Sequence, residues 1–310
     1  MIAVLAGGVG AAKFLEGLVQ VVPQAEIVVV GNTGDDAVVH GLHVSPDLDT
    51  VTYTLAGASN RETGWGIAGD TFKTMDALDR YASETWFRLG DRDLATHLYR
   101  TERLAEGRSL SATTAEITRA WGIELRLLPM SDDAVRTVLT MKNGEVVEFQ
   151  EYFVHRRHSE PVRSVEFQGA TAARPAPGVV EALERADVVI LAPSNPVLSL
   201  GPILALRSLA ETLQRRRESV VAISPIVGGR ALKGPADHLL KELGHKASAL
   251  GVARLLAPVA GSFVLDLADA PLKDAITAEG VGVLVTETVM QTPDVAASLA
   301  KRALDFARSR

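Results

Sequence analysis

Residues 1–21 have the sequence MIAVLAGGVGAAKFLEGLVQV, and the order of apolar residues and glycines in this stretch is the clearest indication of the fold. The aliphatic run Ile2–Ala6 is short and ends at a glycine pair, as expected of a strand buried on both faces of a parallel sheet. The amphipathic segment Ala12–Val21 follows and predicts a helix. The stretch therefore predicts the first strand and helix of a βαβ unit.

The same alternation recurs toward the other end of the chain. Further short aliphatic runs, each bounded by Gly, Pro, Asn or Ser, are Ile27–Val30, Val188–Ala192, Val220–Ile223 and Val281–Val285. Amphipathic segments at Gly201–Arg216 and Pro293–Arg308 predict helices. The pattern is typical of a doubly wound α/β fold with a mainly parallel sheet. A length of 310 residues allows one large domain of this class, or two domains.

The middle of the chain predicts a different structure. Short and more polar strands are expected at Glu124–Leu128, Arg136–Met141, Glu145–Phe149 and Val162–Phe167. The Asn143-Gly144 pair is a strong signal for a two-residue hairpin turn. We therefore predict an antiparallel β insertion over approximately residues 123–170. Helices around residues 70–120 precede it, and Ala170–Gly178 returns the chain to the core.

Composition excludes several classes of function. Lys and Arg number 32 against 38 Asp and Glu, and this net charge of −6 argues against a nucleic-acid partner, whose phosphates need basic clusters. The absence of cysteine excludes disulfides, thiolate metal sites and cysteine nucleophiles. No apolar run approaches the roughly 20 residues of a membrane span, and Met1–Ala6 lacks the basic region of a signal peptide. We expect a cytoplasmic protein that binds neither nucleic acid nor membrane.

The loop after the first predicted strand is the first candidate ligand site. Glycines such as Gly8 and Gly10 allow backbone amides to approach an anion, and the N-terminus of the following helix favours negative charge. The loop is not a Walker A motif, because no Gly-Lys-Ser/Thr follows. It is also a poor dinucleotide fingerprint, since Lys13 occupies the third small position and Asn32 ends the second strand where an acid would hold ribose. A tight turn without a ligand is the alternative.

The loop after the second predicted strand concentrates acidic residues. It begins Asn32-Thr33-Gly34-Asp35-Asp36 and continues through His40 and His43 to Asp47 and Asp49, at the end of the sheet where open α/β folds bind ligands. Carboxylate oxygens suit Mg²⁺, which bridges protein to substrate phosphates. Turn and cap roles are the alternative, and Asp47, which follows a proline, can simply cap a helix.

Three more segments carry candidate side chains. In Trp86–His97, Arg88 can grip a phosphate or carboxylate, and Trp86 or Phe87 can stack on a planar ring. The simpler expectation is a helix capped by Asp91 or Asp93, with His97 as a satisfied polar residue. The loops Pro193–Pro196 and Ser224–Pro235 follow two further strands on the same sheet edge, so they can share a cleft with the glycine loop or merely connect elements.

Together these residues resemble the 2-phospho-L-lactate transferases of coenzyme F420 biosynthesis. The resemblance covers essentially the whole chain and is carried by residues 7–13, 32–36, 40–50, 64–66, 86–97, 193–196 and 224–229. The run GLHVSPDLDT at residues 41–50 is far more specific than any short pattern. One departure is Ala11, where the family often has glycine. A more constrained backbone there can alter how closely a phosphate approaches.

The resemblance implies one transferase domain over residues 1–310, with a Rossmann-like three-layer α/β/α core and a smaller inserted region. It implies a Mg²⁺-dependent reaction between a guanosine diphosphate ester of a three-carbon acid and the deazaflavin alcohol Fo (7,8-didemethyl-8-hydroxy-5-deazariboflavin). The acid is lactyl, enolpyruvyl or glyceryl. The ribityl hydroxyl attacks the phosphorus that carries the acid, and GMP leaves. The family also suggests a homodimer.

The resemblance also implies roles for individual residues. Asp49 and Arg88 match positions that contact Fo, and Trp65 walls the same pocket or belongs to the core. Asp49 and Asp35 are the expected catalytic residues, and the expected metal ligands are Asp35, Asp36 and Asp49. The donor nucleotide and its diphosphate are assigned to Gly8, Gly10, Lys13, Asn32, Thr33, Ser194, Asn195 and Gly229.

Two other functions compete with the transferase. Non-catalytic nucleotide-sugar-binding regulators of similar fold share the glycine loop and the first acidic loop. They lack a counterpart of residues 86–97, which favours the transferase. An NAD-dependent dehydrogenase would rest on the glycine loop alone, and Lys13 and Asn32 argue against it.

Overall fold

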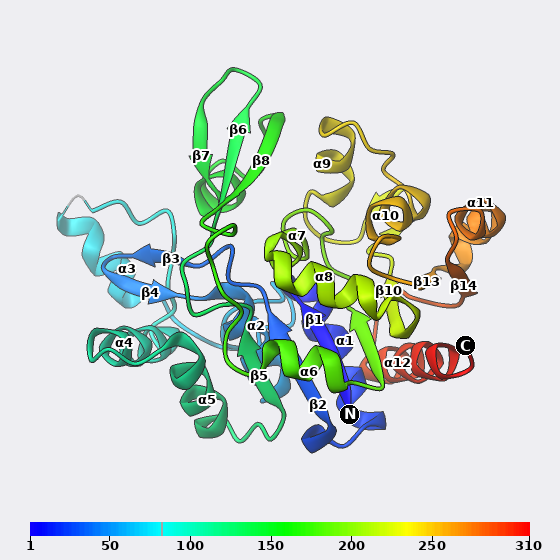
Figure 1. The fold of residues 1–310 in the computed structure, drawn as a ribbon. Coiled ribbons are helices and arrows are strands. Elements are labelled where there is room, and N and C mark those ends of the chain that lie inside the picture. Colours follow the sequence, from blue (N-terminus) through cyan, green and yellow to red (C-terminus); the bar gives the residue numbers. More distant parts are fainter. Residues whose placement is uncertain (82) are drawn as a thin grey trace.

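A computed structural model describes residues 1–81 and 83–310. Its centre is a seven-stranded parallel sheet in the order β5-β2-β1-β9-β10-β13-β14 (Figure 1). The strands are β1 (Ile2–Ala6), β2 (Ile27–Gly31), β5 (Arg126–Pro129), β9 (Val188–Leu191), β10 (Val220–Ile223), β13 (Ser262–Leu265) and β14 (Gly282–Val285). The strand order reverses between β1 and β9, and this switch point is where open α/β sheets bind ligands.

Helices cover both faces of the sheet and complete the three layers. One face packs against α1 (Gly8–Val21), α2 (Pro46–Leu55), α5 (Leu110–Ala120) and α12 (Pro293–Arg308). The other packs against α6 (Val179–Arg185), α7 (Gly201–Ala205), α8 (Arg207–Arg215), α9 (Ala236–Glu242) and α10 (Ala249–Leu256). At Gly17, an added Cβ would lie 2.2 Å from the carbonyl carbon of Ala296, so glycine is needed for α1 and α12 to approach so closely.

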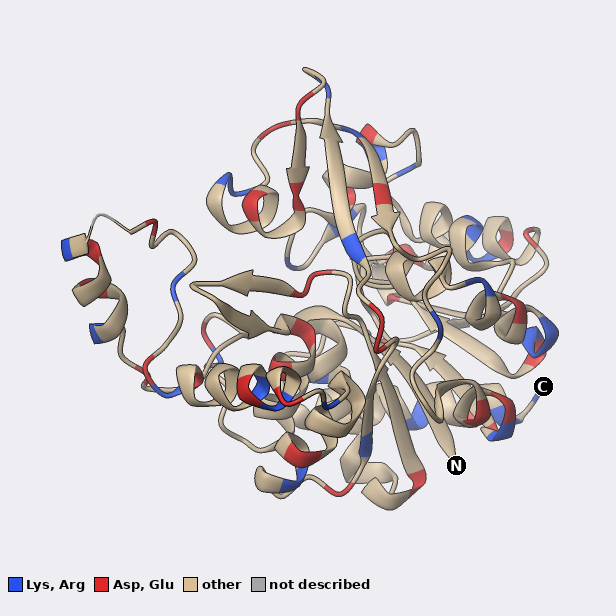
Figure 2. Ribbon diagram, turned by 60° about the vertical axis from the view of Figure 1, so that its left-hand side comes forward, with Lys and Arg blue, Asp and Glu red and all other residues tan. Residues whose placement is uncertain are grey.

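Three small antiparallel sheets and three further helices surround this core. The sheet of β6 (Arg136–Met141), β7 (Val146–Glu148) and β8 (Val162–Gln168) projects beyond the main sheet (Figure 1). The two hairpins are β3–β4 (Ala37–Val39, Leu42–Val44) and β11–β12 (Ile226–Val227, Arg230–Ala231). The helices are α3 (Lys73–Leu78), α4 (Asp93–Ala105) and α11 (Lys273–Thr277). Figure 2 shows acidic and basic residues interspersed on the outer helices.

The α/β class, the parallel core and a hairpin at Asn143-Gly144 are confirmed, but its loop has three residues and not two, because the Gly144 amide donates to Met141 and the Met141 amide to Glu145. The expectation that the insertion begins near residue 123 is wrong in one respect. Residues 126–129 form β5, which pairs parallel to β2 at the edge of the main sheet, because Leu125 and Leu127 are buried against the core. The antiparallel insertion is therefore confined to β6, β7 and β8.

Two other expectations also need correction. Gly201–Arg216 is not one helix, because Leu206 adopts an extended conformation (ψ 105°) that separates α7 from α8. Strand β13 was not predicted, since its four residues begin with a serine that interrupts the aliphatic pattern. Within residues 1–81 and 83–310, no helix has both the length and the apolar character needed to cross a membrane.

Candidate active site

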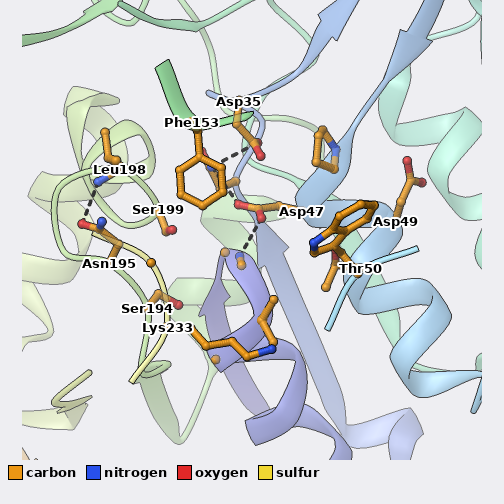
Figure 3. A pocket seen from close by; sticks show the side chains of 18 of the residues that line it. Asp35, Asp47, Asp49, Thr50, Phe153, Ser194, Asn195, Leu198, Ser199 and Lys233 are labelled. Carbon is orange, nitrogen blue, oxygen red and sulfur yellow. Dashed lines mark hydrogen bonds between the residues drawn. The ribbon is translucent and has the colours of Figure 1, made fainter. Parts of the chain in front are cut away.

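A cavity of about 730 Å³ lies at the carboxyl ends of the central strands. It opens beside the switch point between β1 and β9, and its size is in the range of pockets that hold small ligands. Its wall combines three kinds of side chain, which come from segments distant in sequence (Figure 3). The first set consists of the carboxylates that follow β2. The second consists of basic and hydroxyl side chains around the glycine loop, and the third of aromatic side chains.

The glycine loop connects β1 to the N-terminus of α1 and forms the floor of the cavity. Gly8 has φ +70°, a conformation that favours glycine. An added Cβ at Gly10 would lie 2.2 Å from the carbonyl oxygen of Pro193, so this glycine allows the loops after β1 and β9 to meet. The Gly8 amide donates a hydrogen bond of 2.6 Å to Asp47 Oδ1 (Figure 3). A carboxylate of the chain itself therefore occupies part of this anion-binding helix end.

Asn32 links two carboxylates that face the cavity. Its side-chain amide donates to Asp35 Oδ1 at 3.2 Å and to Asp47 Oδ2 at 2.9 Å, while its own carbonyl oxygen accepts from the Gly34 amide. Burial, followed by the charges of Asp47 and Asp36, raises the pKa of Asp35 well above its ordinary value. Burial also raises the pKa of Asp47 to about 6. These carboxylates thus concentrate more negative charge than the nearby groups of the protein neutralise.

Asp36 is not among the residues that line the cavity. One of its carboxylate oxygens accepts from the Ser45 hydroxyl at 2.7 Å, and the other is buried without a hydrogen-bond partner. Burial raises the pKa of Asp36 well above its ordinary value. Of the expected metal ligands, Asp35 and Asp49 line the cavity and Asp36 lies behind them.

Asp49 is buried on α2 and forms an ion pair with the buried guanidinium of Arg100 on α4. Arg100 also donates to the backbone carbonyl of His43. The imidazole of His97 lies 3.7 Å from Asp49 Oδ2 and 3.3 Å from Asp93 Oδ2. Asp49 Oδ2 is buried without a hydrogen-bond partner on the side of His97, and the residue as a whole contributes to the cavity lining.

The chemistry of these donors fits a divalent cation. Four buried or half-buried carboxylates, those of Asp35, Asp36, Asp47 and Asp49, lie close together, only Asp49 forms an ion pair with the buried Arg100, and two of the carboxylate oxygens have no hydrogen-bond partner. Burying so much negative charge is unfavourable without a counterion. In the described part of the chain, no three acidic or histidine side chains already converge as a metal-binding group. A cation would therefore be held by carboxylates that close around it together with substrate oxygens, as is usual for Mg²⁺.

The aromatic wall contains Trp65, Trp86, Phe149 and Phe153. Trp86 stacks on His155 with ring centroids 5.0 Å apart, which ties the segment before α4 to the π-helical turn Glu151–His155 of the insertion. Trp65 is 53% exposed, so it belongs to the cavity rim and not to the core. Arg88 also lines the cavity, although its guanidinium pairs with Asp76 and lies over the Phe72 ring.

Most residues expected to contact a donor surround the glycine loop. Gly8, Gly10, Lys13, Asn32, Ser194 and Asn195 all line the cavity. The Ser194 hydroxyl is buried and has no hydrogen-bond partner, whereas the Asn195 side-chain oxygen accepts from the amides of Val197 and Leu198. Thr33 and Gly229 are not among the lining residues. Lys233, one of the two cations of the candidate loop Ser224–Pro235, had no role of its own in the sequence analysis, and its side chain reaches the same cavity from the loop before α9.

The expected capping roles are corrected by the hydrogen bonds. Asp47 does not cap α2, because both its oxygens accept from residues outside that helix. Asp91 accepts from the amides of Lys73 and Thr74 and so caps α3, whereas the amides of Arg92 and Asp93 at the start of α4 donate to Asp70. His97 is buried beside Asp49.

Comparison with known proteins identifies the family. The family model described as 2-phospho-L-lactate transferase CofD matches residues 2–287. The chain belongs to this family. A phosphoenolpyruvate transferase from Streptomyces griseus is 43% identical over 99% of this chain and 98% of its own length. A 2-phospho-L-lactate transferase from Methanothermobacter thermautotrophicus is 42% identical over 94% of this chain and 93% of its own length. Both of these relatives are named as transferases. The comparison therefore does not favour the alternative function of a non-catalytic nucleotide-sugar-binding regulator.

A solved structure shares the fold. The crystal structure of a member of the UPF0052 family from Bacillus halodurans superposes with a TM-score of 0.63 over 98% of both chains. At 14% sequence identity this likeness concerns the fold alone. It agrees with the seven-stranded parallel sheet and its flanking helices.

Proposed function

We propose that this member of the CofD family transfers the phosphate ester of a three-carbon acid from a guanosine diphosphate donor to the deazaflavin alcohol Fo and releases GMP. The proposal rests on one observation, that a single cavity is lined by the N-terminal end of α1, by a cluster of carboxylates and by aromatic side chains. These three match the diphosphate, the metal-assisted centre and the planar ring of such substrates.

The proposal includes roles for individual residues of the site. The ribityl hydroxyl of the acceptor is placed beside Asp49, which orients it and accepts its proton, while Arg88 and Trp65 hold the rest of the deazaflavin. The donor diphosphate lies along Gly8, Gly10 and Ser194. Phosphoryl transfer depends on positioning and charge neutralisation, so few reactive side chains are required.

Mg²⁺ is the proposed cofactor. Asp35 and Asp49 would hold it, with Asp47 next to them, since these carboxylates face the cavity. Bound there, the cation would neutralise charge on the phosphate oxygens. The homodimer that the family resemblance suggests and the cytoplasmic location expected from the sequence remain part of the proposal, and light scattering tests the homodimer.

GMP release tests the transferase against the regulator. The purified protein, the guanylated acids and Mg²⁺ are incubated with and without Fo, and nucleotides are separated by chromatography. The transferase releases GMP only when Fo is present. Saturable nucleotide binding with no GMP release under any condition would instead identify a non-catalytic binder.

A further inference from the structure

Two lysines, Lys13 and Lys233, line the same cavity. Lys13 lies on the second turn of α1, and Lys233 belongs to a loop more than 200 residues later in the chain. Partial burial and then the nearby charge of Lys13 lower the pKa of Lys233. Within residues 1–81 and 83–310, no carboxylate forms an ion pair with either ammonium group. Two like charges held together without a counterion indicate a place for an anion.

The fold holds Lys233 in this position. Its ammonium group donates a hydrogen bond of 3.0 Å to the carbonyl of Thr63. The next residue, Gly64, has φ +84°, and an added Cβ there would lie 2.6 Å from Val9 Cγ1 and 3.0 Å from Lys233 Nζ. Three distant segments therefore meet above the first turn of α1, and Gly64 leaves the room that Lys233 occupies.

Two further features favour an anion at this point. The first turn of α1, a helix of 14 residues, lines the cavity, and the Gly8 amide at this helix end already donates to Asp47 Oδ1. The Ser194 hydroxyl is 4% exposed, has no hydrogen-bond partner and lines the same wall. A phosphate oxygen there would satisfy the hydroxyl and both ammonium groups. Asp35, Asp47 and Asp49 also line the cavity, and Asp47 accepts from the Gly8 amide, so the anion is assigned to the side of the cavity formed by Ser194 and the two lysines.

We infer that Lys13 and Lys233 form a clamp on the phosphate of the leaving nucleotide, with Lys233 the cation that closes over it. The inference rests on the proposed function. In that reaction the acceptor oxygen bonds to the phosphorus that carries the acid, and the bond from this phosphorus to the bridging oxygen breaks. The electron pair stays on the bridging oxygen, which leaves with GMP, and the hydroxyl proton passes to Asp49. The clamp stabilises the charge that develops on GMP.

Ligand binding without turnover tests the clamp. Dissociation constants for GMP, guanosine and pyrophosphate are measured by calorimetry for the wild type and for Lys233→Ala, Lys233→Arg and Arg230→Ala. Arg230 is a matched control, because it is an exposed cation on β12 in the same segment and does not line the cavity. Loss of one charge-assisted hydrogen bond should weaken GMP and pyrophosphate about tenfold in Lys233→Ala. Guanosine binding should not change, Lys233→Arg should recover part of the loss, and Arg230→Ala should stay within about twofold of wild type.

The outcomes separate this inference from the proposed function. GMP binding to Lys233→Ala within about twofold of wild type overturns the clamp, as does an equal weakening of guanosine, which would show a general effect on the pocket. A wild type that binds pyrophosphate through Lys233 but no guanine nucleotide would retain the clamp and reject the proposed donor. Turnover that is unchanged in Lys233→Ala would reject the clamp and retain the proposed function.

Discussion

Arg100 on α4 and Asp49 on α2 form a buried ion pair directly beneath the cavity, although they are 51 residues apart in the sequence. Each side chain is almost fully buried. The pair fixes which carboxylate oxygen of Asp49 faces inward and which remains without a partner. The residue placed beside the acceptor hydroxyl is thus oriented by a second residue that does not line the cavity.

Replacement of Asp49 should affect both chemistry and stability. In Asp49→Asn, turnover should fall about tenfold or more, because the acceptor hydroxyl loses the carboxylate that orients it and takes its proton. The variant also leaves a buried arginine unpaired, so the free energy of unfolding should drop by about 3–5 kcal/mol. Steady-state kinetics and urea denaturation measure the two effects.

Two further variants serve as references for this prediction. Asp274→Asn, an exposed position on α11, should match the wild type in both measurements. The double change Asp49→Asn with Arg100→Gln should recover part of the lost stability, because the buried guanidinium that lost Asp49 as its partner is then also removed. Near-normal turnover of Asp49→Asn would reject the proposed role of its carboxylate.

The acidic cluster makes thermal stability depend on pH and Mg²⁺. Raised folded-state pKa values mean that the folded protein binds protons more tightly than the unfolded chain does. In EDTA, the unfolding temperature should therefore rise by about 2–5 °C as pH falls from about 7.5 to 5, through the pKa of Asp47 near 6. Mg²⁺ should stabilise the protein more at the higher pH, where the carboxylates are ionised.

Scanning calorimetry over this pH range, with EDTA or Mg²⁺, provides the test. Asp35→Asn should flatten the pH dependence, since it removes one of the repelling carboxylates. A stability that falls steadily between pH 7.5 and 5 in EDTA would contradict the electrostatic account of the cluster.

Gly10 should be intolerant of even the smallest side chain. In Gly10→Ala the new methyl group meets the Pro193 carbonyl oxygen and separates the loops after β1 and β9. We expect GMP affinity to drop about tenfold or more, measured by calorimetry. Gly57→Ala should keep wild-type affinity, because Gly57 does not line the cavity and an added Cβ meets nothing within 4 Å, although its φ of +68° makes alanine strained and lowers stability. Equal affinities in the two variants would disprove the close contact of these loops as a requirement for binding.

Arg88 should affect the acceptor more than the donor. Arg88→Gln removes a cation of the cavity wall, so the KM for Fo should rise about tenfold while GMP affinity stays the same. Arg92→Gln is the control, because Arg92 is exposed, lies in the same segment and does not line the cavity. An unchanged KM for Fo would remove Arg88 from the acceptor site.

The sequence predicts the part of the site that depends on local pattern. Strand ends at residues 6, 31 and 191 place the glycine loop, the acidic loop and Ser194 on one edge of the sheet. Roles that depend on distant partners were not predictable. Gly8 and Asp47 are 39 residues apart, and Lys233 and Thr63 are 170 apart, so no spacing rule brings them together.

The errors have the same origin. β5 was assigned to the insertion because its run is short and interrupted by polar residues, and only its pairing with β2 shows that it belongs to the main sheet. Asp47 after a proline has the local pattern of a helix cap. Its hydrogen bonds to Gly8 and Asn32 arise from packing of the loops that follow β1 and β2.

Mass spectrometry of the deazaflavin product tests the central claim most directly. Purified protein is incubated with Fo, Mg²⁺ and the lactyl, enolpyruvyl or glyceryl guanosine diphosphate ester, with an EDTA control. We expect a deazaflavin that is heavier by one phospho-acid, an equal amount of GMP, and loss of both in EDTA. The donor that gives product identifies the acid. Fo recovered unchanged with every donor, by a folded protein that still binds Fo and nucleotide, would contradict the proposed transfer.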